Sequence, residues 1–165
     1  METSSAYDIP VRLLGLGNEL LADDGFGIRV AREAAVAFGA ALQVVTSAAS
    51  GFHLLDDVLG ARRLLVVDTV ETGAVPPGTL RVWREEEMRP AAGGSPHFIG
   101  LFEVVESARA LRLAAPEELV VVGMEASDCT TVGGPMQPEV EAGIPAAVAL
   151  IGRLIGAFPA REGAP

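Results

Sequence analysis

Four short aliphatic segments constrain the fold of this chain more than any other feature of its sequence. Residues 11–16, 42–47, 64–68 and 119–124 are apolar at most positions, so both faces of a strand built from them would be apolar. Strands with one wet face alternate apolar and polar residues, whereas buried parallel strands do not. The sequence therefore predicts a mostly parallel sheet that is covered on both faces.

Helical patterns between these segments supply that cover. Apolar residues recur there at three- and four-residue steps, which places them on one face of a helix. Three stretches show the pattern: Val30, Ala31, Ala34 and Phe38; Leu101, Val105, Ala108 and Leu111; and Val140, Ile144, Val148, Ile151, Ile155 and Phe158. Pro145 interrupts the third stretch and predicts that its helix starts or kinks nearby.

Residues 79–83 form a fifth predicted strand. The link before it, from Asp68 to Gly78, has no helical period and is short for a parallel crossover, so we expect this strand to run antiparallel. The predicted fold class is α/β, a three-layer α/β/α sandwich around a five-stranded, mostly parallel twisted sheet. We expect one domain over residues 9–158, with flexible tails at 1–8 and 159–165.

The high negative charge restricts the classes of partner. A formal net charge of −10 repels phosphate backbones and anionic lipids, so we expect neither nucleic acid nor a membrane as a partner. The apolar runs are too short and too interrupted to indicate a membrane span, and residues 1–10 do not resemble a signal peptide. A single cysteine, Cys129, forms no internal disulfide. We expect a monomer in the cytoplasm.

Several common catalytic motifs do not occur in the sequence. The loop at residues 15–20 begins like a dinucleotide-binding loop but has Leu20 at the third glycine position, and no acid ends the second strand. Neither a phosphate-binding G-x-x-x-x-G-K-[ST] loop nor a G-x-S-x-G elbow is present. Cys129 is interpreted as an inert small residue, His53 as part of a helix flank, and residues 85–87 as a solvated acidic run.

Three titratable side chains are expected where the parallel strands end, the edge at which functional groups of such sheets collect. Asp24 follows the glycine-rich turn after the first strand, and Asp68 ends the third. His97 falls in the first turn of a helix opened by Ser95 and Pro96, where the positive helix end keeps the imidazole neutral. Local alternatives are a helix N-cap for Asp24 and a packing or capping role for His97.

Together these residues form a candidate metal site. Two carboxylates at neighbouring strand ends repel each other unless a divalent cation neutralises both. With a neutral imidazole as a third ligand and an open position, the set suits nickel or zinc better than magnesium. We therefore assign Asp24, Asp68 and His97 as candidate metal ligands and catalytic residues.

The segment from Leu14 to Gly27 resembles the opening of the nickel-iron hydrogenase maturation endopeptidases. Four further segments agree in order: Asp68 with Gly73 and Pro77 to Thr79; Ser95 to His97 with Gly100 and Leu101; Leu119 to Gly123; and Glu139 to Leu154. The resemblance covers about residues 11–156. It implies a phosphorylase/hydrolase-like sandwich and an endopeptidase that removes a C-terminal peptide from the hydrogenase large-subunit precursor.

The resemblance also implies roles for individual residues. The family's metal-contacting positions fall on Asp24, Asp68 and His97, which would read nickel already held by the precursor, with zinc or cadmium as substitutes in a crystal. A water molecule positioned by a carboxylate, as in an aspartyl protease, would attack the scissile carbonyl and so activate the client enzyme. The substrate-recognition segment falls on Ser47, Ala48, Ala49, Ser50 and Gly51.

This recognition segment departs from the family, whose members usually carry an acid-x-Gly-Thr sequence there. The departure leaves two alternatives open. One is a non-catalytic nickel-checkpoint module that docks on a nickel-loaded precursor, and the other is a metal-assisted hydrolase of another peptide or amide.

Overall fold

The computed structural model describes the backbone of residues 9–88 and 96–157 and the side chains of residues 11–87 and 100–157. Five strands form one sheet in the order β2-β1-β3-β5-β4, in which only β4 runs antiparallel to its neighbour. The strands are β1 (Ile9–Leu16), β2 (Gln43–Ser47), β3 (Ala61–Val70), β4 (Leu80–Arg84) and β5 (Glu118–Glu125). The predicted antiparallel fifth strand is confirmed.

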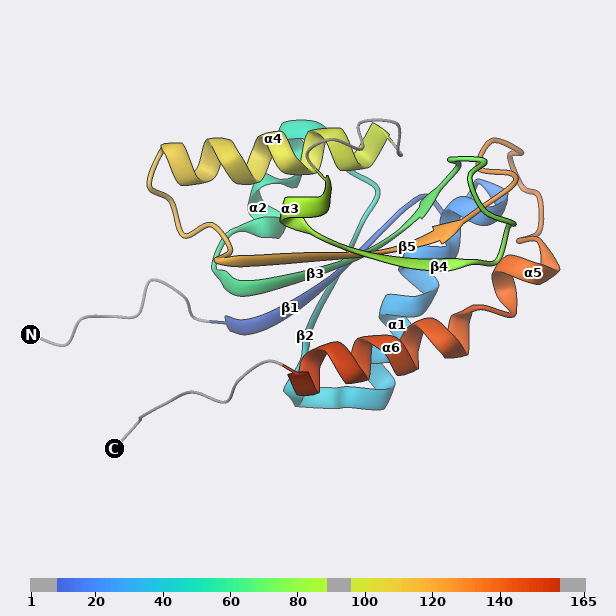
Figure 1. The fold of residues 1–165 in the computed structure, drawn as a ribbon, viewed down its shortest axis with the longest axis horizontal. Helices are drawn as coiled ribbons and strands as arrows, with labels where there is room; N and C mark the ends of the chain where they lie inside the picture. The colour runs from blue at the N-terminus through green and yellow to red at the C-terminus, as the bar shows by residue number, and fades with distance from the viewer. Residues whose placement is uncertain (1–8, 89–95, 158–165) are drawn as a thin grey trace, which may run out of the picture.

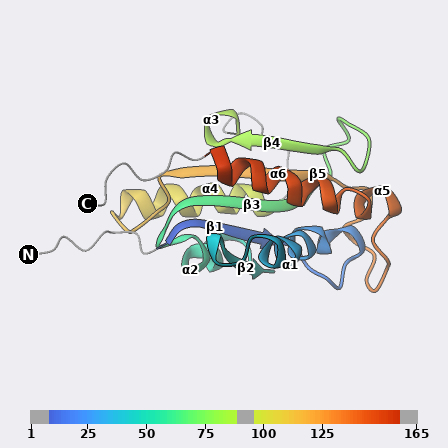
Figure 2. The ribbon, with the colours of Figure 1, turned by 90° about the horizontal axis from the view of Figure 1, so that it is seen from below.

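Helices cover both faces of this sheet (Figure 1), and the view from below shows α1 and α6 in front of the strands (Figure 2). The longer helices are α1 (Phe26–Phe38), α4 (Pro96–Ala110) and α6 (Ile144–Ala157); the short ones are α2 (Leu55–Val58), α3 (Glu85–Met88) and α5 (Pro138–Glu141). Three 3₁₀ helices, η1 (Ala22–Gly25), η2 (Gly39–Ala41) and η3 (Gly51–Leu54), join them. The α1 and α6 helices lie on one side and α2 and α4 on the other, which confirms the predicted sandwich.

Alternation along β3 divides the core into two halves. Leu65 and Val67 belong to the apolar cluster that includes α1 and α6 residues, whereas Leu64 and Val66 belong to the cluster that includes α4 residues. Because successive side chains of a strand point to opposite faces, the next two residues inherit the same division. Asp68 therefore faces the α4 side, and Thr69 faces the α1 side.

Two predicted boundaries are changed by the structure. The third strand does not end at Asp68, because β3 continues to Val70 and Asp68 pairs with Gly123 of β5. The last helical pattern is divided into α5 and α6, and Pro145 is the second residue of α6, where its missing N–H costs nothing. The helix start predicted from Pro145 is thus confirmed, while Phe158 and the predicted tails lie outside the described residues.

By length and composition alone, the helical stretch Pro138–Ala157 is long and apolar enough to cross a membrane. This finding is contrary to the expectation that all apolar runs are too short. In this fold its buried residues, Val140, Ile144, Ala147 and Ile151, pack in the cluster that contains Val30, Val67 and Val122. The stretch therefore serves here as a cover for the sheet.

Glycines allow the start of α1 to approach the sheet at backbone distance. A Cβ atom added at Gly27 would overlap the carbonyl oxygens of Leu16 and Val67, and one at Gly15 would overlap the Gly27 carbonyl oxygen. The overlapping atoms are backbone, which cannot move aside as a flexible side chain can. Any larger residue at Gly27 must push α1 away from β1 and β3.

We expect Gly27→Ala to destabilise the protein by about 1–3 kcal/mol, the usual cost of overpacking, despite the better helix propensity of alanine. Urea unfolding followed by circular dichroism measures this change. Gly156→Ala in α6 is the matched control, because an added Cβ there meets nothing within 4 Å. Equal stability of the two variants would contradict the close contact.

Candidate functional site

The candidate site lies where the parallel strands end, beside η1, the loop after β5 and α5 (right side of Figure 1). Asp24 is the third residue of η1 and is 7% exposed, and Asp68 in β3 is fully buried. The turn before η1 uses a positive φ of 137° at Gly17, and Asn18 N–H donates to the Asp24 carbonyl oxygen at 3.1 Å. This turn delivers Asp24 directly to the end of the sheet.

Asp24 is not a helix N-cap. The cap residue of α1 is Gly25, and no side-chain hydrogen bond caps either η1 or α1. Instead, the Asp24 carboxylate accepts a hydrogen bond from the Thr69 hydroxyl, with 3.2 Å between Oγ1 and Oδ1. The capping alternative is therefore wrong for this residue, and its carboxylate is directed toward β3.

Thr69 connects the two candidate carboxylates. Its backbone N–H donates to Asp68 Oδ1 at 2.8 Å, while its hydroxyl donates to Asp24. Asp68 and Thr69 point to opposite faces of the sheet, so the two acids approach the end of β3 from the α4 side and the α1 side. Asp24 and Asp68 thus both accept a hydrogen bond from the same residue, Thr69.

The neighbouring acid, Asp23, has a different role. It is fully buried, and its carboxylate accepts three backbone N–H groups: Ser127 at 3.1 Å and Asp128 at 3.0 Å on Oδ2, and Gln137 at 2.7 Å on Oδ1. The Asp23 N–H also donates to the Asp128 carbonyl oxygen at 2.9 Å. Asp23 therefore anchors the 126–137 loop against η1 and leaves Asp24 to face β3.

We expect Asp23→Asn to destabilise the fold by about 2–3 kcal/mol, because an amide NH₂ facing backbone N–H donors leaves buried groups unsatisfied. Thermal unfolding measures the loss. The matched control is Asp128→Asn: the Asp128 carboxylate accepts the backbone N–H groups of Thr130 and Thr131 and the Thr130 hydroxyl at Oδ1, and asparagine keeps an acceptor at that atom. A Tm for Asp23→Asn as high as that of the control would argue against the anchor.

Cys129, in the same loop, approaches the site through Thr69. Its Sγ donates to Thr69 Oγ1 at 3.5 Å. Desolvation by burial raises the pKa of the Cys129 thiol to about 12, with Glu71, Asp24 and Asp23 adding to the shift and the Thr69 bond opposing it. The thiol thus stays protonated at neutral pH, in agreement with the interpretation of Cys129 as no nucleophile.

We expect native Cys129 to react slowly with iodoacetamide at pH 8.5, because that pH lies well below its raised pKa and the thiolate is the reactive form. The rate should rise by about tenfold for each pH unit until the pH approaches the pKa. Mass spectrometry follows the alkylation, and the urea-unfolded protein is the control. Equally fast labelling of native and unfolded chains would show that the pKa is not raised.

The predicted recognition segment is placed between β1 and α4. The Gly17 N–H donates to the Ser47 carbonyl oxygen at 3.2 Å, and the Ala49 N–H donates to Ser47 Oγ at 3.2 Å. Gly51 then contacts Gly100 in α4, where an added Cβ would lie 2.7 Å from the Gly51 nitrogen. The segment is therefore fixed at one end to the site turn and at the other to the helix that carries His97.

His97 is the second residue of α4, but its side chain lies outside the described part of the structure. The beginning of α4 lies at the same end of the sheet as the carboxyl ends of the parallel strands (Figure 1). Within the described side chains, no three His, Cys, Asp or Glu residues form a group able to hold a metal ion. His97 is not among these side chains, so the predicted triad stays a prediction.

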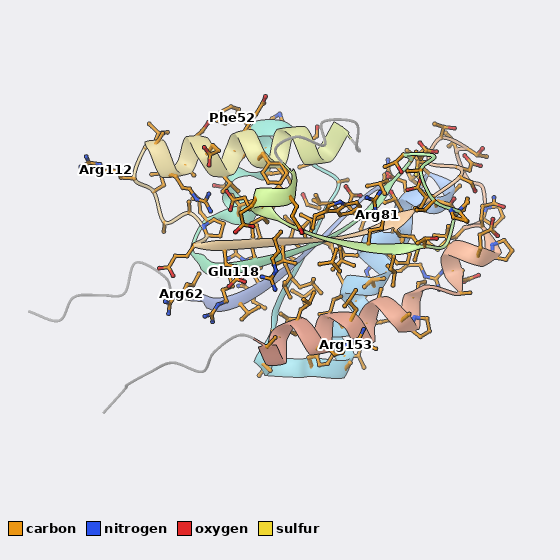
Figure 3. All side chains as sticks on the ribbon, in the orientation of Figure 1. Phe52, Arg62, Arg81, Arg112, Glu118 and Arg153 are labelled. Carbon is orange, nitrogen blue, oxygen red and sulfur yellow. The ribbon has the colours of Figure 1, made fainter. Side chains whose placement is uncertain are left out.

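The structure also bears on the predictions for the acidic run at residues 85–87 and for His53. The acidic run is not simply solvated, because Glu85 forms a two-bond ion pair with Arg109 at 2.5 and 3.0 Å. The hydrogen bonds that Arg109 donates to Glu85 raise the pKa of Arg109 above its ordinary value. His53 lies exposed in η3 next to Phe52, which points outward from the α4 side of the molecule (Figure 3).

Sequence reasoning missed the contributions of Asp23 and Thr69. Each lies next to a predicted site residue, but each makes its decisive contact with a residue more than 40 positions away. The one available signal was the occurrence of polar residues directly after apolar strands. That signal does not show which acid of a pair faces inward.

Comparisons with known proteins agree on one family. A family model described as hydrogenase maturation protease matches residues 28–153. The chain belongs to the hydrogenase maturation protease family. Members of this family are endopeptidases, that is, peptide hydrolases.

Individual relatives cover most of the chain. The hydrogenase expression/formation protein HupD of Bradyrhizobium diazoefficiens is 32% identical over 142 residues, covering 83% of this chain and 73% of that protein. HoxM of Cupriavidus necator is 33% identical over 140 residues, covering 82% and 68%. The hydrogenase maturating endopeptidase HybD from E. coli superposes with a TM-score of 0.78 at 25% identity, covering 90% of this chain and 93% of that one.

Proposed function

We propose that this protein is the endopeptidase that removes the C-terminal extension of a nickel-iron hydrogenase large-subunit precursor after nickel insertion. Membership of the hydrogenase maturation protease family carries this proposal. The site adds support, since Asp24 and Asp68 are both buried at the sheet end and both bonded to Thr69. The activity corresponds to hydrolysis of one peptide bond in a folded client.

The chemistry of the acids is consistent with a nickel-bearing substrate. Two carboxylates bonded to one uncharged residue repel each other, and a divalent cation between them relieves that repulsion. In the proposed complex the precursor brings the nickel ion, and Asp24, Asp68 and His97 contact it. One carboxylate holds the attacking water molecule and takes its proton, as an aspartyl protease does.

The remaining assignments follow from the same proposal. The segment Ser47 to Gly51 contacts the precursor next to its nickel site, since its ends are fixed to the site turn and to α4. The enzyme works as a cytoplasmic monomer in which the lone Cys129 stays reduced. Nickel arrives with the client, so the purified enzyme requires no metal of its own, and zinc or cadmium can replace nickel in a crystal.

Neither alternative accounts for the comparisons as well. A checkpoint module or a hydrolase of other amides would explain the unusual sequence at residues 46–50. However, one curated relative, 30% identical over 120 residues, is the hydrogenase 2 maturation protease of Escherichia coli. That name, like the HybD title, favours proteolysis of a hydrogenase precursor.

The direct test is incubation of the full chain with the nickel-loaded large-subunit precursor of its own source organism. We expect the precursor to lose the mass of its C-terminal extension, measured by intact mass spectrometry. The nickel-free precursor is the matched control and should remain uncut. Nickel-dependent complex formation without a loss of mass would support the checkpoint alternative instead.

Variants of the predicted triad test its role in cleavage. Asp68→Asn and His97→Ala should each lower the cleavage rate by about 10²–10⁴-fold, the range for loss of a general acid–base group, while the circular dichroism spectrum is unchanged. His53→Ala and Asp56→Asn change the same residue types at exposed positions and serve as controls. Wild-type cleavage by either triad variant would remove that residue from the mechanism.

A further inference from the structure

Thr69 is unusual in this site because one residue donates to two buried carboxylates through two different groups. Its N–H meets Asp68 Oδ1 at 2.8 Å, and its hydroxyl meets Asp24 Oδ1 at 3.2 Å. Thr69 itself is 2% exposed, so water does not readily replace either bond. Both acids thus share one residue that is neither acidic nor basic, and the contact with Asp24 is the one that its side chain makes.

A hydrogen bond from the Cys129 thiol sets the direction in which the Thr69 hydroxyl proton points. A hydroxyl carries one proton to donate and two lone pairs to accept with. Since the Cys129 Sγ–H donates to Thr69 Oγ1, the hydroxyl proton is free to point at Asp24. The resulting chain runs from thiol to hydroxyl to carboxylate and links three segments of the sequence: the 126–137 loop, β3 and η1.

Strand geometry fixes the position of this chain. Thr69 lies within β3 and pairs with Met124 of β5, so its backbone is held by the neighbouring strand. Its β-branched side chain has few rotamers. A hydrogen-bond donor with a fixed backbone and a restricted side chain holds a carboxylate in place at a lower entropic cost than a mobile donor would.

We propose that Thr69 is a positioning residue, which holds the Asp24 carboxylate in register with Asp68 so that both can meet the divalent ion borne by the substrate. This inference deepens the proposed function and rests on it. Thr69 acts through Asp24 and does not touch the substrate. Its contribution is therefore to the geometry of the acids, rather than to the chemistry of the peptide bond.

A pair of substitutions separates the hydroxyl from the rest of the side chain. Thr69→Val keeps the shape and loses the hydroxyl, and we expect it to lower kcat/KM for the nickel-loaded precursor by about tenfold, as for one lost hydrogen bond to a charged group. Thr69→Ser keeps the hydroxyl and loses a buried methyl group, and it should stay within about threefold of the wild type.

Stability distinguishes this role from a structural one. Serine loses buried apolar surface that valine retains, so a purely structural role predicts that the Ser variant is the more impaired in both Tm and cleavage. If Thr69 positions Asp24, the Val variant should cleave the precursor more slowly than the Ser variant. A Val variant that cleaves as fast as the Ser variant would overturn the proposal.

A binding cycle gives a readout that is independent of cleavage. Ni²⁺ titration by calorimetry compares the wild type, Thr69→Val, Asp24→Asn and the double variant. We expect Thr69→Val alone to weaken Ni²⁺ binding by several-fold relative to the wild type. The double variant should bind Ni²⁺ no more weakly than Asp24→Asn alone. Additive effects would show that Thr69 does not act through Asp24. Failure of wild-type cleavage would reject the proposed function, whereas the binding cycle still decides the role of Thr69.

Discussion

The close contact between the start of α1 and the strands β1 and β3 is the constraint on which the rest of the site depends. Backbone meets backbone there, because Gly15 and Gly27 have no side chains to separate the helix from the sheet. As a consequence η1, which directly precedes α1, is held against the ends of the parallel strands. A side chain at either glycine would push α1 outward and move Asp24 away from Thr69.

Because of this placement, the consecutive acids Asp23 and Asp24 have different roles. Asp23 takes three backbone donors from one loop and becomes part of the framework, while Asp24 accepts from Thr69 at the end of the sheet. Neighbouring residues in a 3₁₀ turn point about a third of a turn apart. The same short segment can therefore hold the loop with one carboxylate and direct the next one toward β3.

Most of the fold could be predicted from the sequence because its signals are local. Aliphatic runs without alternation define buried strands, and a Gly/Pro-rich link too short for a crossover defines the antiparallel β4. The end of β3 was placed too early, since a polar residue such as Asp68 normally marks the end of a buried strand, and here it is retained inside one by pairing with Gly123. Asp24 and Asp68 were found from strand ends and family resemblance. Thr69 and Asp23 were not, because their function is decided by contacts between distant segments.

The contact between Gly51 and Gly100 joins the segment after β2 to α4 at backbone distance. Since the joint is made by main-chain atoms, it does not depend on which side chains the exposed residues 48 and 50 carry. These exposed positions can thus change during evolution while the seat of the segment on α4 is inherited intact. An atypical sequence at residues 46–50 on an ordinary framework is the outcome that such a joint permits.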